Sequence, residues 1–344
     1  MAGFREFPTR RRDLLRWTAG ASAVVLGGGG GAYAARLAGR LTVRLGTVGG
    51  LPGLWRYIAM RADALFGSHG YNVTFQTYPT EAALRAAYLA GQLDAIDTLV
   101  PTVALLREAG SDARFFLATG WLHQSYPFVA RAANPARGLN NLGSQPIASY
   151  PLDDPVMGYW LGLAPAALGI DLRRLNLVPS QRPDLALLYG DAASACFATN
   201  QWELLAGDPT FRRLADLQTA WSALSGATRP LVLRGYVASA AFLARHADFA
   251  RDFVASHRAA LRVYQQDRNA FLNVVANFPD GPTLGPSLSQ IQATALGYDG
   301  VAPDRVTIGA ADLGDYRRLL PLMVQAGFLR TLPDVATLFQ TIAV

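Results

Sequence analysis

Residues 41–101, LTVRLGTVGGLPGLWRYIAMRADALFGSHGYNVTFQTYPTEAALRAAYLAGQLDAIDTLVP, decide the fold of this chain. Leu41 to Thr47 predict a strand, and the glycines and proline from Gly49 to Gly53 end it. Apolar residues then recur at helical spacing from Trp55 to Leu65, which predicts a helix. The stretch therefore opens with a strand, a glycine-rich turn and a helix.

A second strand and helix follow within the same stretch. Residues 72–77 predict a strand, Thr80 and Glu81 give an N-cap signal, Gly91 ends the helix, and Asp94 to Ile96 begin a third strand. This alternation predicts a parallel sheet, and open sheets of this kind bind small ligands where their strands end. The ligand loops are then expected at residues 47–54, 77–81 and 97–102.

The second half of the chain repeats this order. Leu175 to Val178 predict a strand, Pro183 to Tyr189 a short helix, and Gly190 to Ala193 the start of another strand. Two units of the same order predict two similar α/β lobes. Leu231 to Ala238 predict a late strand that returns to the first lobe, so the lobes are expected to be joined near Ala130 and near Gly235.

The remaining elements complete the predicted domain plan. We expect residues 1–34 to be an export signal, residues 35–130 plus 235–344 to form lobe 1, and residues 131–234 to form lobe 2. Further strands are expected at residues 115–119, 128–131 and 146–149, and further helices at residues 101–108, 155–169, 248–265, 268–277, 288–296, 315–326 and 333–342.

The amino-terminal segment has the features of an export signal. Arg11 and Arg12 lie in the run RRDLLR, which matches the twin-arginine pattern, and Ala32-Tyr33-Ala34 has the form that a signal peptidase cleaves. The uncharged span from Trp17 to Ala35 is long enough for a membrane anchor. Its five consecutive glycines disfavour a helix, so cleavage near Ala35 and a periplasmic protein are expected, with a membrane tether as the alternative.

Composition excludes several kinds of site. The chain has no lysine, which excludes a phosphate-loop nucleotide site and a pyridoxal Schiff base. Cys196 is the sole cysteine and is expected to be a small buried residue, and His123 has no second histidine at metal-ligand spacing. Half of the formal net charge of +6 lies in residues 1–34, and the rest has no arginine cluster, so nucleic acid is not an expected partner. We predict no cofactor, no metal and no catalytic residue.

Several short motifs, taken in order, resemble one family of transport proteins. They are Val43 to Gly46, Tyr71 to Phe75, Gly91 to Ala95, Pro101, and Gly190 to Ala193. Together they look like the nitrate, sulfonate and taurine type of periplasmic solute-binding protein, a group that includes relatives for thiamine precursors. The resemblance implies the type II periplasmic binding protein fold, a small-molecule ligand between two lobes that close about a hinge, and delivery to an ABC permease and its ATPase at the inner membrane. It is also consistent with a monomer exported by the twin-arginine translocase.

The predicted ligand site combines loop residues from both lobes. Backbone amides at two glycines and one threonine, with two hydroxyl groups, are expected to bind the polar end of a ligand, while aromatic side chains cover its apolar body. The candidate residues are Gly49, Gly50, Tyr78, Thr80, Thr98, Thr102, Trp121, Ser149, Tyr150 and Trp202.

Two carboxylates bear on the nature of the ligand. Asp153 and Asp154 lie beside the start of a predicted helix, where they would repel an anion. They favour a larger, partly aromatic solute with at most one acidic group over nitrate or a short sulfonate. The alternative is that Asp154 caps its helix and Asp153 is solvated, which leaves the backbone amides usable.

Two other functions use the same fold. Relatives that are lyases or thiamine-pyrimidine synthases are enzymes, but the resemblance implies a nucleophilic cysteine or a cysteine-rich motif that this sequence lacks. A ligand-sensing partner of a membrane receptor would have the same lobes. Solute binding for transport is the leading prediction.

Overall fold

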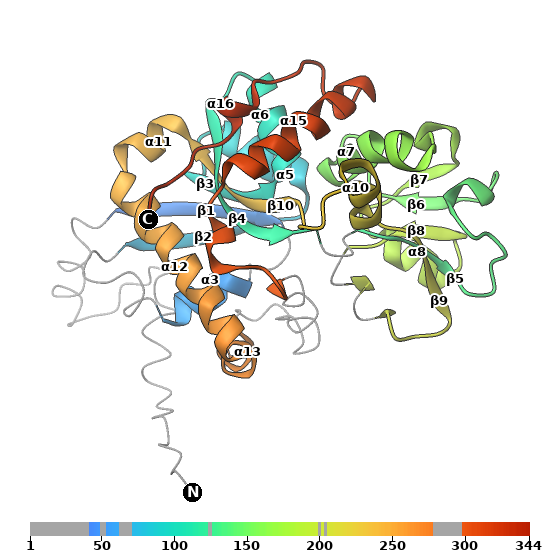
Figure 1. Cartoon of the computed structure of the whole chain (residues 1–344), viewed down its shortest axis with the longest axis horizontal. Coiled ribbons are helices and arrows are strands. Elements are labelled where there is room, and N and C mark those ends of the chain that lie inside the picture. The colour runs from blue at the N-terminus through green and yellow to red at the C-terminus, as the bar shows by residue number, and fades with distance from the viewer. Residues whose placement is uncertain are drawn as a thin grey trace, which may run out of the picture.

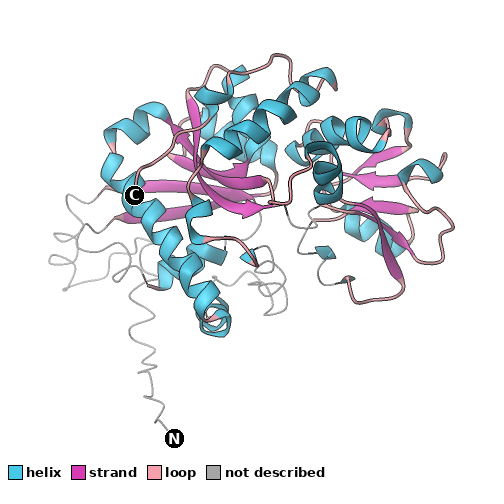
Figure 2. Ribbon diagram, in the orientation of Figure 1, coloured by secondary structure: helices cyan, strands magenta, loops and turns pink. Residues whose placement is uncertain are grey.

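A computed structural model describes residues 41–48, 53–61, 71–122, 126–198, 201–202, 205–277 and 298–344. The predicted export signal, the helix expected at residues 288–296, and Gly49, Gly50 and His123 lie outside these residues. The described chain forms two lobes, each with a five-stranded sheet flanked by helices (Figure 1, Figure 2). None of the described helices combines the length and apolar character needed to cross a membrane.

The first sheet confirms the alternating unit predicted from residues 41–101. Its strand order is β2-β1-β3-β10-β4. Strand β1 pairs in parallel with both β2 and β3, whereas β10 is antiparallel to β3 and β4. The strands are β1 (Thr42–Val48), β2 (Asn72–Tyr78), β3 (Ala95–Leu99), β4 (Ala113–Trp121) and β10 (Val232–Ser239). The predicted return strand thus lies in the first sheet.

The second sheet has the same arrangement. Its order is β7-β6-β8-β5-β9, with β6 parallel to β7 and β8, and with β5 antiparallel to β8 and β9. Each sheet therefore receives one antiparallel strand at the point where the chain crosses between lobes, which confirms the prediction of two similar α/β lobes. The strands are β5 (Phe128–Arg131), β6 (Ile147–Ser149), β7 (Leu177–Pro179), β8 (Ser194–Cys196) and β9 (Phe211–Ala215).

Helices cover both sheets. Those of the first lobe are α3 (Gly53–Met60), α5 (Glu81–Leu89), α6 (Val100–Glu108), α11 (Ala240–Arg245), α12 (Ala247–Gln266) and α13 (Arg268–Ala276). The second lobe has η2 (Leu139–Asn141), α7 (Pro155–Leu163), η3 (Ala164–Leu168), η4 (Leu172–Arg174), α8 (Pro183–Tyr189) and α10 (Leu217–Ser225). The carboxyl-terminal part has η6 (Pro303–Val306), α15 (Ala310–Gln325) and α16 (Val335–Leu338).

Two glycines allow close packing in the first lobe. A Cβ atom on Gly46 of β1 would lie 2.4 Å from the side chain of Leu93, which follows α5. This glycine therefore lets Leu93 pack directly against β1. A Cβ atom on Gly235 of β10 would lie 1.9 Å from the carbonyl oxygen of Leu117 on β4. Gly235 is therefore required for the return strand to fit into the first sheet.

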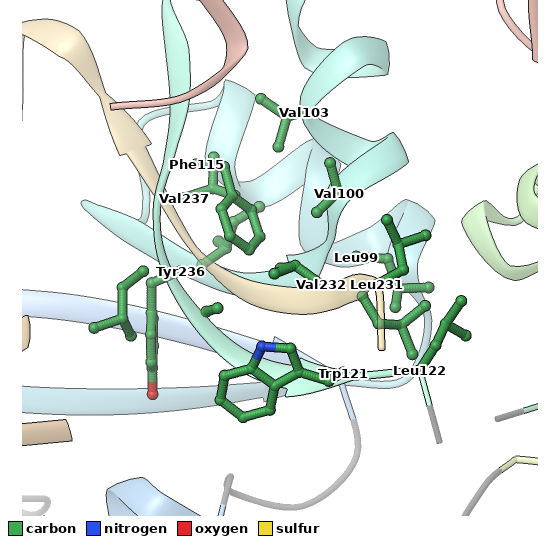
Figure 3. Close-up of a cluster of buried hydrophobic side chains, with 14 of the residues drawn as sticks. Leu99, Val100, Val103, Phe115, Trp121, Leu122, Leu231, Val232, Tyr236 and Val237 are labelled. Carbon is green, nitrogen blue, oxygen red and sulfur yellow. The ribbon is translucent and has the colours of Figure 1, made fainter. Parts of the chain in front are cut away.

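The core of the first lobe surrounds β10. Phe115 and Val237 lie on one side of the sheet and Trp121 and Tyr236 on the other (Figure 3). All four side chains are almost completely buried. Trp121, which we predicted to contact ligand, is part of this apolar cluster and is 2% exposed.

The carboxyl-terminal part packs against both lobes. Helix α15 packs along α7 of the second lobe, where Gly162 leaves room for Met323. The hydroxyl oxygens of Tyr159 and Tyr316 are 2.7 Å apart, and each lies within hydrogen-bond distance of a backbone carbonyl at the start of β10. These contacts tie α7 and α15 to the strand that joins the lobes.

One predicted helix differs from the structure, and three of the strands and α-helices were not predicted. The helix predicted at residues 333–342 is limited to the four residues of α16, because Phe339 forms a parallel bridge with Phe115 and Gln340 donates a backbone bond to that residue. Strand β9 and helices α10 and α11 were not predicted. The edge strand β9 is neither strongly apolar nor strictly alternating, so its sequence FRRLA gives little strand signal.

Candidate functional site

The carboxyl edge of the first sheet carries a buried ion pair. Arg234 Nε donates to Asp97 Oδ2 at 2.6 Å, and the Asp97 carboxylate also accepts from the hydroxyl groups of Thr119 and Thr47 at 3.0 and 3.5 Å. Asp97 has no exposed surface, and burial raises the pKa of its carboxyl although Arg234 opposes the shift. Arg234 Nη2 donates to Thr47 Oγ1 at 3.1 Å, which links β10 to β1 across β3. The pair and its two threonine partners thus come from four strands, β1, β3, β4 and β10.

Glu81 lies at the same edge without an arginine partner. It is the first residue of α5, it is 8% exposed, and it accepts a 2.6 Å hydrogen bond from the Thr98 hydroxyl. The Thr98 hydroxyl also lies 2.9 Å from the Thr102 hydroxyl, so the three side chains form a short hydrogen-bonded chain. Burial raises the pKa of Glu81 to about 7, with Arg234 and Thr98 opposing and Asp154 and Asp97 adding to the shift.

The second lobe contributes the start of α7. Asp154 caps this helix, because its Oδ1 accepts from the Val156 backbone amide at 2.9 Å, as the capping alternative predicted. Burial raises the pKa of Asp154 to about 6; the capping bond and Arg85 oppose this shift, and Asp153 adds to it. Asp153 is exposed, as that alternative also predicted.

Two tyrosines lie beside this helix start. The rings of Tyr126 and Tyr150 meet edge to face with centroids 6.4 Å apart. The carbonyl oxygen of Tyr126 accepts from Trp160 Nε1 at 3.0 Å and from the Cys196 thiol at 3.6 Å. Among the described non-glycine residues, Tyr126 alone has a positive φ, 49°, which is unusual for a bulky side chain. The two bonds to its carbonyl hold this conformation.

Groups from the two lobes come together at this edge, where α6, with Thr102 in its first turn, packs against α7. The charge of Asp154, in the second lobe, raises the pKa of Glu81 in the first lobe. Burial raises the pKa of Tyr126, with both carboxylates adding to the shift and Arg234 opposing it. We use the term interlobe site for this group, which consists of Thr47, Glu81, Asp97, Thr98, Thr102, Tyr126, Ser149, Tyr150, Asp154 and Arg234.

Four of the predicted site residues belong to the interlobe site. Thr98, Thr102 and Ser149 are fully buried there, and Tyr150 is half-buried. The Ser149 hydroxyl makes no hydrogen bond to any described residue. Thr98 and Ser149 lie at the ends of β3 and β6, and Thr102 and Tyr150 follow these strands, which is why position at a strand end could identify them.

The other predicted residues lie elsewhere or make other contacts. The Thr80 hydroxyl caps α5 by accepting from Ala83 N at 3.1 Å, and the Tyr78 hydroxyl donates to Gln76 at 2.8 Å. Trp202 is 6% exposed and packs in a small apolar cluster of the second lobe. Ligand contact by these residues, by Trp121 and by the two undescribed glycines stays a prediction.

Sequence reasoning recognised Asp154 but missed the ion pair of Asp97 and Arg234. Asp97 lies in the middle of a buried apolar strand, and Arg234 lies in an apolar return strand. A charged residue inside such a strand is a usable signal, because an ion is buried only where a partner or a function stabilises it. Glu81 was recognised as a helix-start residue and Tyr126 was not considered.

A surface hollow of about 490 Å³ lies at the opposite edge of the first sheet. Arg44, at the start of β1, and Ser239, at the end of antiparallel β10, are among the residues that line it. Since ligands of open α/β sheets bind at the carboxyl ends of parallel strands, the hollow is at the wrong edge for the predicted site. Within the described residues, no group of three or more histidine, cysteine, aspartate or glutamate side chains is arranged to hold a metal ion.

No protein-family model and no curated protein sequence matches this chain. Solved structures do match. The alkanesulfonate-binding protein SsuA of Xanthomonas axonopodis pv. citri, bound to MOPS, is 14% identical with a TM-score of 0.64, over 87% of this chain and 98% of that one. The periplasmic aliphatic sulphonate-binding protein SsuA of Escherichia coli is 13% identical with a TM-score of 0.64, over 88% and 92%.

Two further matches extend the comparison. A protein of Bordetella bronchiseptica RB50 is 16% identical with a TM-score of 0.66, over 88% of this chain and 95% of that one. A Candida albicans protein described as having the generic periplasmic binding protein structural fold is 9% identical with a TM-score of 0.60, over 88% and 96%. These similarities confirm the predicted fold: the chain has the two-lobed α/β fold of periplasmic solute-binding proteins.

Proposed function

We propose that the chain is the substrate-binding component of an ABC importer and carries a small organic solute to a permease and ATPase in the inner membrane. The observation that carries the proposal is the interlobe site, in which buried polar and aromatic groups of both lobes converge where the strands end. Such a site can bind a solute between the lobes, and closure about the joining strands would bury it.

The aromatic pair supports a partly aromatic or heterocyclic solute. Tyr126 and Tyr150 are available at one side of the site, and aromatic rings bind planar ligands through stacked or edge-to-face contacts. Asp154 keeps a small compact anion from the start of α7 although it caps that helix. Sulfonate binding by the structural neighbours therefore does not transfer to this chain without a test.

Export and domain boundaries complete the proposal. The twin-arginine signal would direct the chain through its translocase to the periplasm, where a monomer with a cleaved or tethered amino terminus would act. The proposed boundaries at residues 130/131 and 234/235 fall inside β5 and β10. Sheet membership favours moving them to just before Phe128 and just before Val232.

An enzymatic role has less support. Burial raises the pKa of the Cys196 thiol, which is the reverse of what a nucleophilic cysteine needs. A receptor-partner role would use the same site, so only the partner distinguishes it.

A thermal-shift screen tests the proposal. The purified protein is heated with sulfonates, nitrate, pyrimidines, flavins, aromatic acids and aromatic amines. A ligand at 100 times its dissociation constant adds about 2.7 kcal/mol to the free energy of unfolding. Small-angle scattering with the best ligand should show a smaller radius of gyration. A protein that no small solute stabilises would count against a solute-binding role.

A further inference from the structure

We propose that the interlobe site binds its solute through a protonated nitrogen, which lies between the carboxylates of Glu81 in the first lobe and Asp154 in the second. This inference rests on the proposed solute-binding function and names the chemical class of the solute. Such a solute is an amine or basic heterocycle with an aromatic or apolar body that contacts Tyr126 and Tyr150.

The burial of Glu81 without an ion pair is the first observation. Asp97 and Glu81 lie at the same sheet edge, and both are more than nine-tenths buried. Asp97 has Arg234 at 2.6 Å, whereas Glu81 has no cation within ion-pair distance among the described residues. A carboxylate removed from water without a partner is strongly disfavoured as an anion, and a cation bound beside Glu81 would stabilise its ionised form.

The unused oxygens of the two carboxylates are the second observation. Thr98 bonds to Oε2 of Glu81, and the α7 amide bonds to Oδ1 of Asp154. Within the described chain, the other oxygen of each carboxylate accepts no hydrogen bond. Neither of these two oxygens is among the fully buried atoms that lack a partner. Two acceptors from opposite lobes suit a donor with two or more N–H groups, and their joint use would hold the lobes together.

Ser149 gives an independent indication of a ligand. Its side chain is fully buried and its hydroxyl has no partner among the described residues. Ser149 is the last residue of β6, and because side chains alternate along a strand it points to the same face of the sheet as Ile147. Ile147 packs in the same apolar cluster as α7, whereas Ala148, on the other face, packs in the cluster that includes α8. Its hydroxyl therefore lies on the face where α7 begins with Asp154. A buried hydroxyl without a partner at this point is explained by a polar ligand group.

The surrounding charges favour a cation over an anion. Glu81, Asp97 and Asp154 are the acidic groups coupled to the site, with the exposed Asp153 beside them. The cations are Arg234, which is engaged by Asp97, and Arg85, which lies one helical turn after Glu81 and acts on Asp154. Arg85 Nη1 is buried and has no hydrogen-bond partner among the described residues. Near Tyr150, Arg182 and Asp184 form an ion pair with each other, so they add no net charge.

The two helix starts give the same result. An oxyanion would bind at the first turns of α5 and α7, but Glu81 and Asp154 already place the protein's own carboxylates there.

A matched trio of probes tests the inference. Benzylammonium, benzyl alcohol and phenylmethanesulfonate share one aromatic body and differ in charge. At 20 mM each and pH 8, benzylammonium should raise the melting temperature and the other two should not. Titration calorimetry should show at least about tenfold weaker benzylammonium binding in Glu81→Gln and in Asp154→Asn, because each loses one charge-assisted contact.

The variants are chosen to keep the fold. Glutamine at position 81 still accepts from Thr98, and asparagine at position 154 still caps α7. Asp153 precedes Asp154 and has an exposed side chain. Asp153→Asn removes one negative charge, as Asp154→Asn does, but should change the affinity for benzylammonium by no more than about twofold.

Proton release provides a second readout. Binding a cation requires ionised Glu81, whose neighbours are Asp97, Arg234, Thr98 and Asp154. Because burial raises the pKa of Glu81 to about 7, affinity for benzylammonium should increase from pH 6 to pH 8 in the native protein, and in Glu81→Gln it should change less and level off by pH 7. Asp154, with a pKa of about 6, contributes at the acidic end of that range.

The outcomes separate the two proposals. No shift with benzylammonium at 20 mM, or unchanged affinity in both variants, overturns the assignment of a cation to this position. Stabilisation by phenylmethanesulfonate alone also overturns it but leaves the solute-binding role intact. If neither this trio nor the wider screen stabilises the protein, both proposals fail.

Discussion

Replacing Glu81 by glutamine should stabilise the ligand-free protein at alkaline pH. The side chain is 8% exposed and has no ion pair among the described residues, so its charge is held in an unfavourable environment. Glutamine keeps the shape and the acceptor for the Thr98 hydroxyl but carries no charge. The effect should therefore come from the charge alone.

The sign and size follow from the raised pKa. The carboxyl of Glu81 has a pKa of about 7 in the folded protein, against 4.5 for an unperturbed glutamate. The folded state thus keeps a proton that the unfolded state loses, and the free energy of unfolding falls as pH increases from 4.5 through 7. At 1.36 kcal/mol per pKa unit, the loss at pH 8 is about 3 kcal/mol as an upper estimate.

Urea unfolding at several pH values measures the effect. The native protein and Glu81→Gln should have nearly equal free energies of unfolding at pH 4, and the variant should be more stable by up to about 3 kcal/mol at pH 8. Asp153→Asn, with its exposed side chain, is the control and should give a flat difference. A flat difference for Glu81→Gln, or a less stable variant at pH 8, would refute the reasoning.

Three further predictions concern packing, the ion pair and export. Gly235→Ala should lower the free energy of unfolding by about 3 kcal/mol or more, because the new Cβ atom would lie 1.9 Å from a backbone carbonyl of β4. The control Gly314→Ala in α15, whose Cβ atom would have no neighbour within 4 Å, should raise the free energy of unfolding by up to about 1 kcal/mol. Equal urea midpoints for the two variants would contradict this. Arg234→Met should cost about 3 to 5 kcal/mol at pH 8, because it leaves Asp97 buried without its cation, and adding Asp97→Asn should recover part of the loss in the same urea assay. Replacing Arg11 and Arg12 by lysine should leave the precursor in the cytoplasm, and normal periplasmic accumulation in cell fractions would count against the twin-arginine signal.

The local signals in the sequence predicted the framework correctly. Thr80 and Asp154 cap the helices that their neighbours predicted, and Leu231 to Ala238 return to the first sheet. Capping and strand formation depend on residues a few positions apart, so a single sequence contains them. Pairing of the chain end with Phe115 is a long-range contact, and the helix predicted at residues 333–342 was wrong for that reason.

The chemistry of the site was less accessible from sequence. Arg234 and Asp97 are separated by 137 positions and meet because β10 pairs with β3. Trp121 and Tyr150 were both predicted as ligand contacts because each was expected to follow a strand. Trp121 is 2% exposed and lies in the core, whereas Tyr150 is half-buried at the site. Position after a strand places a residue at the correct edge, but the face to which its side chain points is set by packing across the sheet.

The first residues of β10 connect recognition to lobe movement. Arg234 fixes Asp97 at the site, while the backbone carbonyls of Val232 and Leu233 accept from Tyr316 and Tyr159, which hold α15 against α7. A movement of the second lobe must therefore carry α7 past contacts that end within two residues of the ion pair. A solute bound by both Glu81 and Asp154 would stabilise one arrangement of α7 relative to the first lobe, and it would relieve the buried charge of Glu81 in the same step. Affinity and closure would then share one source of free energy.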